Sequence, residues 1–532
     1  MKKTLLTLSL AGFMAGAWAQ QNPTAMKYAQ IISADLARKH LSIIASDEYE
    51  GRETGQPGAD KAAHYIADEF KSLGLKPIVN GSYFFDVPVV NSTFKVTSFT
   101  VNGTPLTSGK DFNANGAGNK TIDAKDIVFT GYGIGADNYD DLKGVDITGK
   151  VVMYISNGEP MNNGLSKITG TDKVSDWSAP RSRKRAAYIL SKKPLMVFAV
   201  AINNGAAGGQ GGRRPGGGGA PAARMGLKPE GPVITPVTFN IPAATADILL
   251  KNSGKTIAEL KAGIDQGGMP QSQTIKADIS TSYITEEAPV KAVDVLGFLP
   301  GSDPKLKDEV LVISAHYDHI GLVRDPNAKD KVNNGADDDG SGTTGIMEIA
   351  RAFSQAKKNG HGPKRSILFL SNVGEEKGLL GSEYYTDHPV IPLERTITDL
   401  NIDMIGRVGY EYIGKPDSAN YVYVIGSGML STDLRNVSEK ANKTYTNLIL
   451  DYKYDDLNDN NHFYERSDHY NFAKHGVPII FYFNGVHADY HQPGDEVSKI
   501  GFPMLAKRAQ LVFYTAWDLL NAPNRPVVDG KK

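Results

Sequence analysis

The second half of the chain alternates strand-like apolar runs with helical stripes, and this alternation constrains the fold more than any other feature. Strand-like runs occupy 309–315, 366–371, 400–404 and 477–483. Apolar residues recur at helical spacing over 346–353 and 505–519. Strands that alternate with helices build parallel βαβ units, because a parallel strand needs a crossover connection. We therefore predict an α/β fold with a mixed, mostly parallel sheet flanked by helices.

The first half of the chain contains two kinds of pattern. Apolar residues recur at helical spacing over 33–45 and 62–73, which predicts two helices. From about residue 126 the pattern changes to short β-rich runs separated by turn residues, so we predict a small, mainly β module at 126–285. Within it, residues 203–223 are dominated by Gly, a composition that cannot build a core and predicts a flexible surface loop.

The first nineteen residues have the pattern of a secretory signal peptide. Lys2 and Lys3 precede an apolar run, and Ala17-Trp18-Ala19 provides the small residues that a signal peptidase recognises. The apolar run is shorter than the roughly 20 residues that a transmembrane helix needs. We expect cleavage after Ala19 and a periplasmic or secreted protein without a membrane anchor.

Composition narrows the possible chemistry. The chain has no Cys, which excludes disulfides, thiolate metal ligands and a Cys nucleophile. Its 58 Lys and Arg against 59 Asp and Glu give a net charge of −1, so no overall positive field attracts nucleic acid. Any strongly bound metal must therefore be held by His, Asp or Glu.

Histidines and carboxylates follow the predicted strands, where ligands bind in open α/β sheets. They lie in the segments 316–319, 335–342, 374–376, 401–404 and 490–495. Carboxylates brought together would repel one another and raise their pKa values unless cations neutralise them. We therefore predict a metal centre. Imidazole with carboxylate favours zinc, allows manganese or cobalt, and disfavours magnesium.

The number of ligands predicts two metal ions. Two His and three carboxylates exceed the three protein ligands of one catalytic zinc, and a shared carboxylate gives each ion three. Two ions about 3.5–4 Å apart can hold a bridging hydroxide and clamp a substrate oxygen. Of the adjacent Glu375 and Glu376, one can bind metal while the other acts as general base. Such a centre performs hydrolysis.

Taken together, these motifs resemble the co-catalytic di-zinc exopeptidases, a family that includes leucyl-type aminopeptidases, aminopeptidase S and glutamate carboxypeptidase. The resemblance is carried by His316-x-Asp318, by 335–342, by Glu375-Glu376, by 401–404 and by Tyr490-His491. It implies two Zn²⁺ ions per chain. The implied metal ligands are His316 and Asp403 at one ion, Glu376 and His491 at the other, and Asp338 as the bridge.

The same resemblance implies three catalytic roles. Glu375 is the expected general base, which takes a proton from the attacking water and passes it to the leaving amine. Asp318 is expected to orient His316 by accepting its other ring N–H. Tyr490 is expected to donate a hydrogen bond to the tetrahedral oxyanion, with plain packing beside His491 as the alternative.

Three segments of the β module resemble the protease-associated domain that is inserted in many of these peptidases: 131–134, 139–142 and 149–152. The resemblance implies a discontinuous zinc peptidase domain at 20–125 and 286–532, interrupted by a protease-associated-like domain at 126–285. The Gly-rich stretch is not a usual feature of such a domain.

The predicted function is that of an exported di-zinc aminopeptidase, which hydrolyses N-terminal peptide bonds of peptide substrates through a metal-bridging hydroxide. A glutaminyl cyclase with a single zinc on the same fold is the alternative enzyme, and a metal-free binding relative is a third possibility. The presence of both His316 and Asp403 favours two metals. Side-chain specificity, the chain end that is attacked and the oligomeric state are not fixed by any motif.

Overall fold

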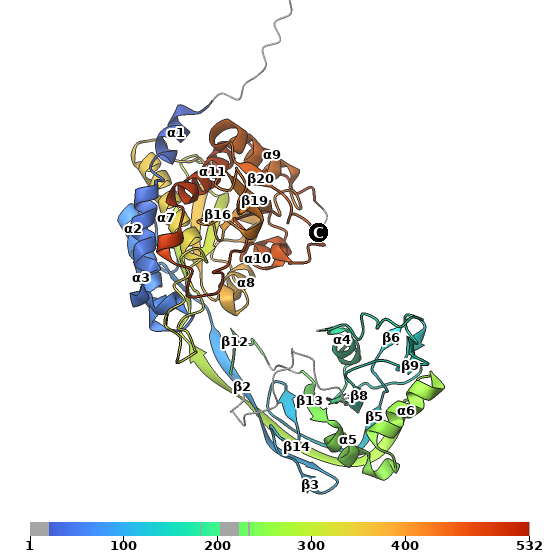
Figure 1. The fold of residues 1–532 in the computed structure, drawn as a ribbon. Coiled ribbons are helices and arrows are strands. Elements are labelled where there is room, and N and C mark those ends of the chain that lie inside the picture. Colours follow the sequence, from blue (N-terminus) through green and yellow to red (C-terminus); the bar gives the residue numbers. More distant parts are fainter. Residues whose placement is uncertain (1–20, 181, 203–222, 232, 234, 531–532) are drawn as a thin grey trace, which may run out of the picture. The chain divides into compact units, whose positions relative to one another are not determined.

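The computed structural model describes residues 21–180, 182–202, 223–231, 233 and 235–530, which form two compact units (Figure 1). The first unit comprises Met1–Val89 and Val290–Lys532, and the second comprises Val90–Pro289. The predicted signal peptide and residues 203–222 of the predicted Gly-rich loop lie outside the described residues.

The boundary between the units differs from the predicted one on the N-terminal side. We placed it between residues 125 and 126, whereas the second unit begins at Val90. The reason is that β2 (Val89–Val101) and the start of β5 (Lys120–Phe129) pair with β14 (Gln273–Val290), so residues 90–125 belong to the sheet of the second unit. On the C-terminal side the boundary lies at Val290, close to the predicted residue 286.

The first unit is built on an eight-stranded mixed sheet in the order β1-β15-β17-β16-β18-β21-β19-β20. Its four central strands, β17, β16, β18 and β21, are parallel, whereas β15 and β19 pair antiparallel to them. The bounds are β1 Phe84–Asp86, β15 Val293–Leu299, β16 Val310–His316, β17 Ser366–Asn372, β18 Thr396–Ile402, β19 Tyr421–Ile425, β20 Ile449–Asp451 and β21 Ile479–Phe483.

Helices flank both faces of this sheet, which confirms the predicted fold class. On one face, alternate side chains such as Val312 and Leu368 pack in a cluster with Tyr385 of α8 and Phe472 of α10. On the other face, Phe369 contacts Phe70 of α3. The helices are α1 Pro23–Ala29, α2 Ala34–Ile44, α3 Pro57–Leu73, α7 Gly340–Lys358, α8 Leu380–Asp387, α9 Thr432–Ala441, α10 His469–Lys474 and α11 Phe502–Asn521.

The predicted elements agree with the observed ones except at one strand. We expected a strand at 400–404, but β18 runs from Thr396 to Ile402. The early part of β18 was missed because Thr398 and Asp399 interrupt its apolar pattern, although both are fully buried. Thr398 Oγ1 donates to the Pro478 carbonyl and Asp399 Oδ1 accepts from Ser314 Oγ, so each side chain has a hydrogen bond inside the sheet.

The second unit is mainly β, with a nine-stranded sheet. Besides β2, β5 and β14, the sheet contains β3 Thr104–Pro105, β4 Asn113–Asn115, β8 Val151–Ile155, β11 Met196–Ala201, β12 Arg224–Leu227 and β13 Val237–Pro242. Its helices are α4 Lys184–Ser191, α5 Ala243–Leu250 and α6 Ile257–Gly267. Two short hairpins, β6–β7 (Gly135–Ala136, Tyr139–Asp140) and β9–β10 (Met161–Asn162, Leu165–Ser166), complete it.

The predicted motif at 131–142 forms a tight turn around the carboxylate of Asp141. Asp141 is buried and accepts hydrogen bonds from the amides of Tyr132 and Ile134 and from the hydroxyl of Tyr139. Gly131 has a positive φ of 59°, and a Cβ there would lie 2.4 Å from Asp141 Oδ1. The motif is therefore structural. In the part of the chain that the structure describes, no helix is both long and apolar enough to cross a membrane.

Candidate metal centre

The parallel strands bring all five predicted metal ligands to one edge of the first unit's sheet. β16 ends at His316, β17 is followed by the turn that carries Glu376, and β18 is followed directly by Asp403. His491 lies in the loop after β21, and Asp338 lies just before α7. The ligands are separated by up to 175 residues in sequence (491 − 316) and meet because neighbouring parallel strands end at the same edge.

The first cluster surrounds the Nε2 atom of His316. Asp338 Oδ1 lies 3.5 Å from it, Asp403 Oδ2 3.6 Å and Glu375 Oε2 3.9 Å. These distances exceed those of hydrogen bonds. They are close to the spacing of about 3.3–3.6 Å expected between two atoms that each lie about 2.0–2.2 Å from one tetrahedral zinc ion. His316 Nε2 is buried without a hydrogen-bond partner among the described residues, so the donor set fits a metal ion.

The second cluster forms on the other oxygen of Asp338. His491 Nε2 lies 3.1 Å from Asp338 Oδ2 and 3.0 Å from Glu376 Oε2. One carboxylate therefore faces His316 with Oδ1 and His491 with Oδ2. This arrangement would allow one carboxylate to bridge two ions, and its residues are those of the predicted ligand set.

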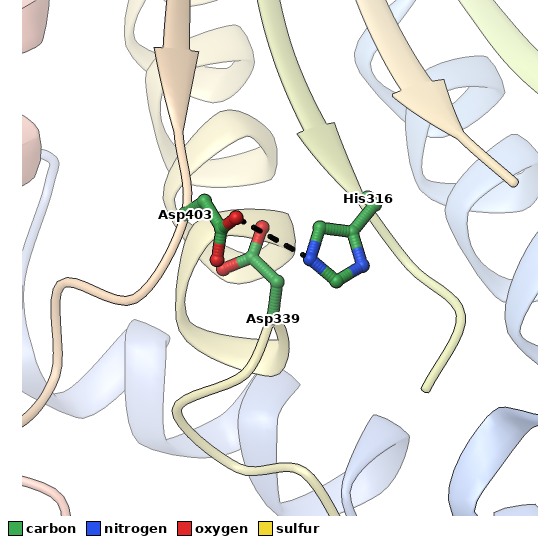
Figure 2. A group of neighbouring side chains, drawn as sticks. All are labelled: His316, Asp339 and Asp403. Carbon is green, nitrogen blue, oxygen red and sulfur yellow. Dashed lines mark ion pairs between the residues drawn. The ribbon is translucent and has the colours of Figure 1, made fainter. Parts of the chain in front are cut away.

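Two residues outside the predicted ligand set also reach the clusters. His319 Nδ1 lies 2.8 Å from Glu376 Oε1, and the ligand atoms of His319, Asp338 and Glu376 all lie within 4.8 Å of one another. Asp339 groups in the same way with His316 and Asp403, as Figure 2 shows. Asp339 Oδ1 already accepts the amides of Gly342 and Met404, so this carboxylate caps α7.

His316 contacts the Asp318 main chain instead of forming the predicted hydrogen bond to the Asp318 carboxylate. His316 Nδ1 lies 3.1 Å from the main-chain oxygen of Asp318, whereas Asp318 Oδ1 is 3.8 Å away. The carboxylate is held elsewhere, since it accepts hydrogen bonds from Thr54 Oγ1 at 2.7 Å and from the Glu375 amide at 3.2 Å. Asp318 thus orients His316 through its backbone, and its side chain fixes the turn that carries Glu375.

Glu375 lies beside the first cluster with most of its side chain buried. Burial raises the pKa of Glu375; the charge of His316 lowers it, and the charges of Glu376 and Asp403 raise it again, so that the pKa is well above the usual range. A carboxylate with a raised pKa accepts a proton more readily, as a general base at neutral pH must. Glu376 differs, because hydrogen bonds from His319 and His491 outweigh its burial and the charge of Asp338 and lower its pKa to about 2.

Tyr490 stacks on His491, with ring centroids 4.0 Å apart and an interplanar angle of 19°. Burial, together with the charges of Asp338 and Glu376, raises the pKa of Tyr490 well above its usual value, so the phenol keeps its proton. Its oxygen accepts a hydrogen bond from Arg466 Nη2 at 3.2 Å. The hydroxyl hydrogen is therefore available for another acceptor, as the predicted role requires.

A buried arginine from the N-terminal segment supports both ligand loops. Arg52, with 1% of its surface exposed, donates to the carbonyls of Tyr317 at 2.7 Å, Asn334 at 2.6 Å and Gly335 at 2.8 Å. The Tyr317 carbonyl directly follows the ligand His316. The carbonyls of Asn334 and Gly335 directly precede the 336–339 turn, which contains the ligand Asp338. The link explains why residues before the second unit belong to the site, although Arg52 contributes no ligand.

Sequence reasoning missed the polar support of Asp403. Ser467 Oγ donates to Asp403 Oδ2 at 2.7 Å and accepts from Asn401 Nδ2 at 2.9 Å. Asn401 and Ser467 are both fully buried. Asn401 lies two residues before Asp403, but Ser467 is distant in sequence from every predicted site residue, so no local pattern paired them.

A cavity beside the metal cluster is lined by polar residues and by apolar ones. Asp338, Glu375 and Asp403 line it together with Tyr490 and Arg466, and its apolar lining is Met404, Phe463, Phe481, Phe483 and Val486. Phe481 and Phe483 alternate along β21 and therefore point to the same side of the sheet. The alternation was visible in the sequence, but which face would border a cavity was not.

Residues 294–516 match the model of peptidase family M28. The match confirms the family resemblance that we drew from the motifs. The identification of the second unit as a protease-associated domain stays a prediction.

Similar proteins carry aminopeptidase names. Aminopeptidase YwaD of Bacillus subtilis (strain 168) is 25% identical over 230 residues, which cover 41% of this chain and 43% of YwaD. A probable leucine aminopeptidase of Arthroderma otae is 29% identical over 235 residues, 43% of this chain and 58% of that protein. The chain thus covers about half the length of these relatives.

Solved structures also align over nearly the whole chain. An aminopeptidase from Aneurinibacillus sp. strain AM-1 aligns with a TM-score of 0.50 and 17% identity, over 96% of this chain and 98% of that protein. At this identity the likeness concerns the fold alone.

Proposed function

We propose that this chain is a di-zinc aminopeptidase that removes residues from the N-terminus of peptides. The observation that carries the proposal is the position of Asp338, whose Oδ1 faces His316 and whose Oδ2 faces His491. His316 and Asp403 would hold one zinc ion, Glu376 and His491 the other, and Asp338 both. When bound, the two ions would polarise the scissile carbonyl and lower the pKa of a water molecule.

The other steps belong to side chains of this chain. Glu375 would accept the proton of the attacking water and pass it to the leaving amine, since it borders the cavity beside Asp338 and Asp403. Tyr490 would donate its hydroxyl hydrogen to the oxyanion of the tetrahedral intermediate. The apolar wall formed by Met404, Phe463 and Phe481 would receive an apolar N-terminal side chain.

Chelation and substitution of Glu375 test this proposal. The zinc-loaded protein should release leucine from Leu-p-nitroanilide faster than lysine or aspartate from their anilides, and a chelator should stop the release. Glu375→Gln should lower kcat about 10²–10⁴-fold while zinc content stays at two ions per chain. Chelator-insensitive turnover, or a near-normal rate in Glu375→Gln, would contradict the mechanism.

The zinc content also separates the aminopeptidase from the glutaminyl cyclase alternative. A single zinc per chain, together with cyclisation of N-terminal Gln peptides and no release of leucine, would support the cyclase. We further propose that the protein is exported with cleavage after Ala19, based on the N-terminal sequence pattern. N-terminal sequencing of the mature protein tests this, and a chain that retains Met1 would contradict it.

A further inference from the structure

Arg466 lies at the exposed rim of the active-site cavity, one aromatic ring away from the metal cluster. Its guanidinium carbon lies 4.9 Å from the ring centroid of Phe463, and its Nη2 donates to Tyr490 Oη at 3.2 Å. Tyr490 in turn stacks on His491. Arg466 and Tyr490 both line the same cavity as Asp338 and Glu375.

Among the described residues that line this cavity, Arg466 carries the positive charge. The other charged lining residues, Asp338, Glu375 and Asp403, are acidic and belong to the metal cluster or border it. No carboxylate within the described ranges forms an ion pair with Arg466. Arg435 provides a contrast, since it also stacks on an aromatic ring, that of Tyr452, but forms an ion pair with Glu439 at 3.1 Å.

A guanidinium group has five N–H donors in a planar arrangement that matches a carboxylate. The hydrogen bond to Tyr490 uses one of them, which leaves donors at the cavity rim without an anionic partner. In an aminopeptidase, the N-terminal residue of the substrate lies against the metals, and the leaving part of the peptide extends towards solvent. The rim is therefore where a negative charge on the leaving part would meet Arg466.

We propose, building on the proposed aminopeptidase function, that Arg466 binds a carboxylate on the leaving part of the substrate. Two sources share this chemistry: the α-carboxylate of a dipeptide, and the side chain of an acidic second residue. In either case the enzyme selects peptides with a negative charge close to the scissile bond. Arg466 is then a specificity-determining residue of the leaving-group side.

The test compares Arg466→Gln with the wild type on three matched substrates: Leu-Gly, Leu-Gly-amide and Leu-Asp-amide. The loss of kcat/KM on Leu-Gly should exceed the loss on Leu-Gly-amide by about 10–100-fold, as expected when hydrogen bonds to a charged group are removed. A comparable excess loss on Leu-Asp-amide identifies an acidic side chain as a source, and its absence restricts the role to the α-carboxylate. Arg466→Lys, which keeps the charge without the planar donors, should recover part of the difference.

Arg435→Gln is the matched control, because it removes a guanidinium that stacks on an aromatic ring outside the cavity lining. It should leave all three rates unchanged. Zinc content and circular dichroism of Arg466→Gln establish that the variant folds and binds metal. Equal losses on the acid and amide substrates would overturn the proposal and assign Arg466 to the support of Tyr490. A zinc-loaded wild type that releases no leucine from Leu-p-nitroanilide would instead overturn the aminopeptidase function, and this inference with it.

Discussion

The two units each bury carboxylates, but they satisfy them in different ways. In the second unit, Asp141 receives two amide N–H groups and one hydroxyl at 2.9–3.1 Å. In the first unit, Asp338 faces the imidazoles of His316 and His491 and lies near other carboxylates. The difference shows that main-chain and hydroxyl donors complete the hydrogen bonding of Asp141, whereas the charge of Asp338 is balanced by the neighbouring histidines when they are protonated, or by cations when these are bound.

The largest expected effect that separates the two carboxylates concerns zinc-dependent stability. Zinc at about 1,000 times its dissociation constant should stabilise the wild type by about 4 kcal/mol. Asp338→Asn should lose most of this gain, because the variant lacks the shared ligand of both ions. Thermal unfolding with zinc and with a chelator measures the effect. A variant that keeps the full gain would show that Asp338 does not hold the metals.

Asp141→Asn should have a smaller effect, and on a different property. It should lower the stability of the metal-free protein and leave zinc binding unchanged. Replacing one carboxylate oxygen by an amide NH₂ disrupts the hydrogen bonds around the turn and should cost about 1–3 kcal/mol of unfolding free energy. Zinc content and the rate on Leu-p-nitroanilide should stay at wild-type values. Urea denaturation of the metal-free protein measures the cost. A loss of zinc binding in this variant would remove the distinction between the two carboxylates.

The third prediction uses pH on the metal-free protein. Burial by itself lowers the pKa of His491, but hydrogen bonds to Asp338 and Glu376 and their charges raise it to about 10. Because the folded-state pKa lies above the ordinary value of about 6.5, this contribution to stability is complete below about pH 6.5 and is lost as the pH rises to about 10. His491→Asn should therefore flatten the decline in melting temperature over this range.

Asp141 titrates at a lower pH than His491, so the contributions of the two residues to stability can be separated. Burial raises the pKa of Asp141 to about 6 even though hydrogen bonds from Ile134, Tyr139 and Tyr132 lower it. For an acid with a raised pKa, the stability contribution is present below its ordinary pKa of about 3.9 and is lost as the pH rises through about 6. Asp141→Asn should alter stability between pH 4 and 6 without changing the alkaline decline. An alkaline decline that persists in His491→Asn would contradict the assignment to His491.

Much of the fold, and the residues that meet at the candidate metal centre, could be predicted from the sequence. The strand that ends at His316 and the strand that precedes the turn with Glu376 are continuous apolar runs of the kind that parallel, doubly covered strands require, and their polar ends mark the active edge. The roles of Asp318 and the boundary at Val90 could not be predicted. Both depend on contacts between distant segments, Thr54 with Asp318 and β2 with β14, that leave no local pattern.

The sequence by itself determined which residue types could bind metal and in which order they follow the strands, because periodicity and polar strand ends are local properties of the chain. Only the tertiary structure decided which atoms meet: that Asp338 offers one oxygen to each histidine, that Asp318 orients His316 through its backbone, and that Arg466 reaches Tyr490 at the cavity rim. The physical reason is that side-chain direction is set by packing among segments far apart in sequence, which no single segment encodes.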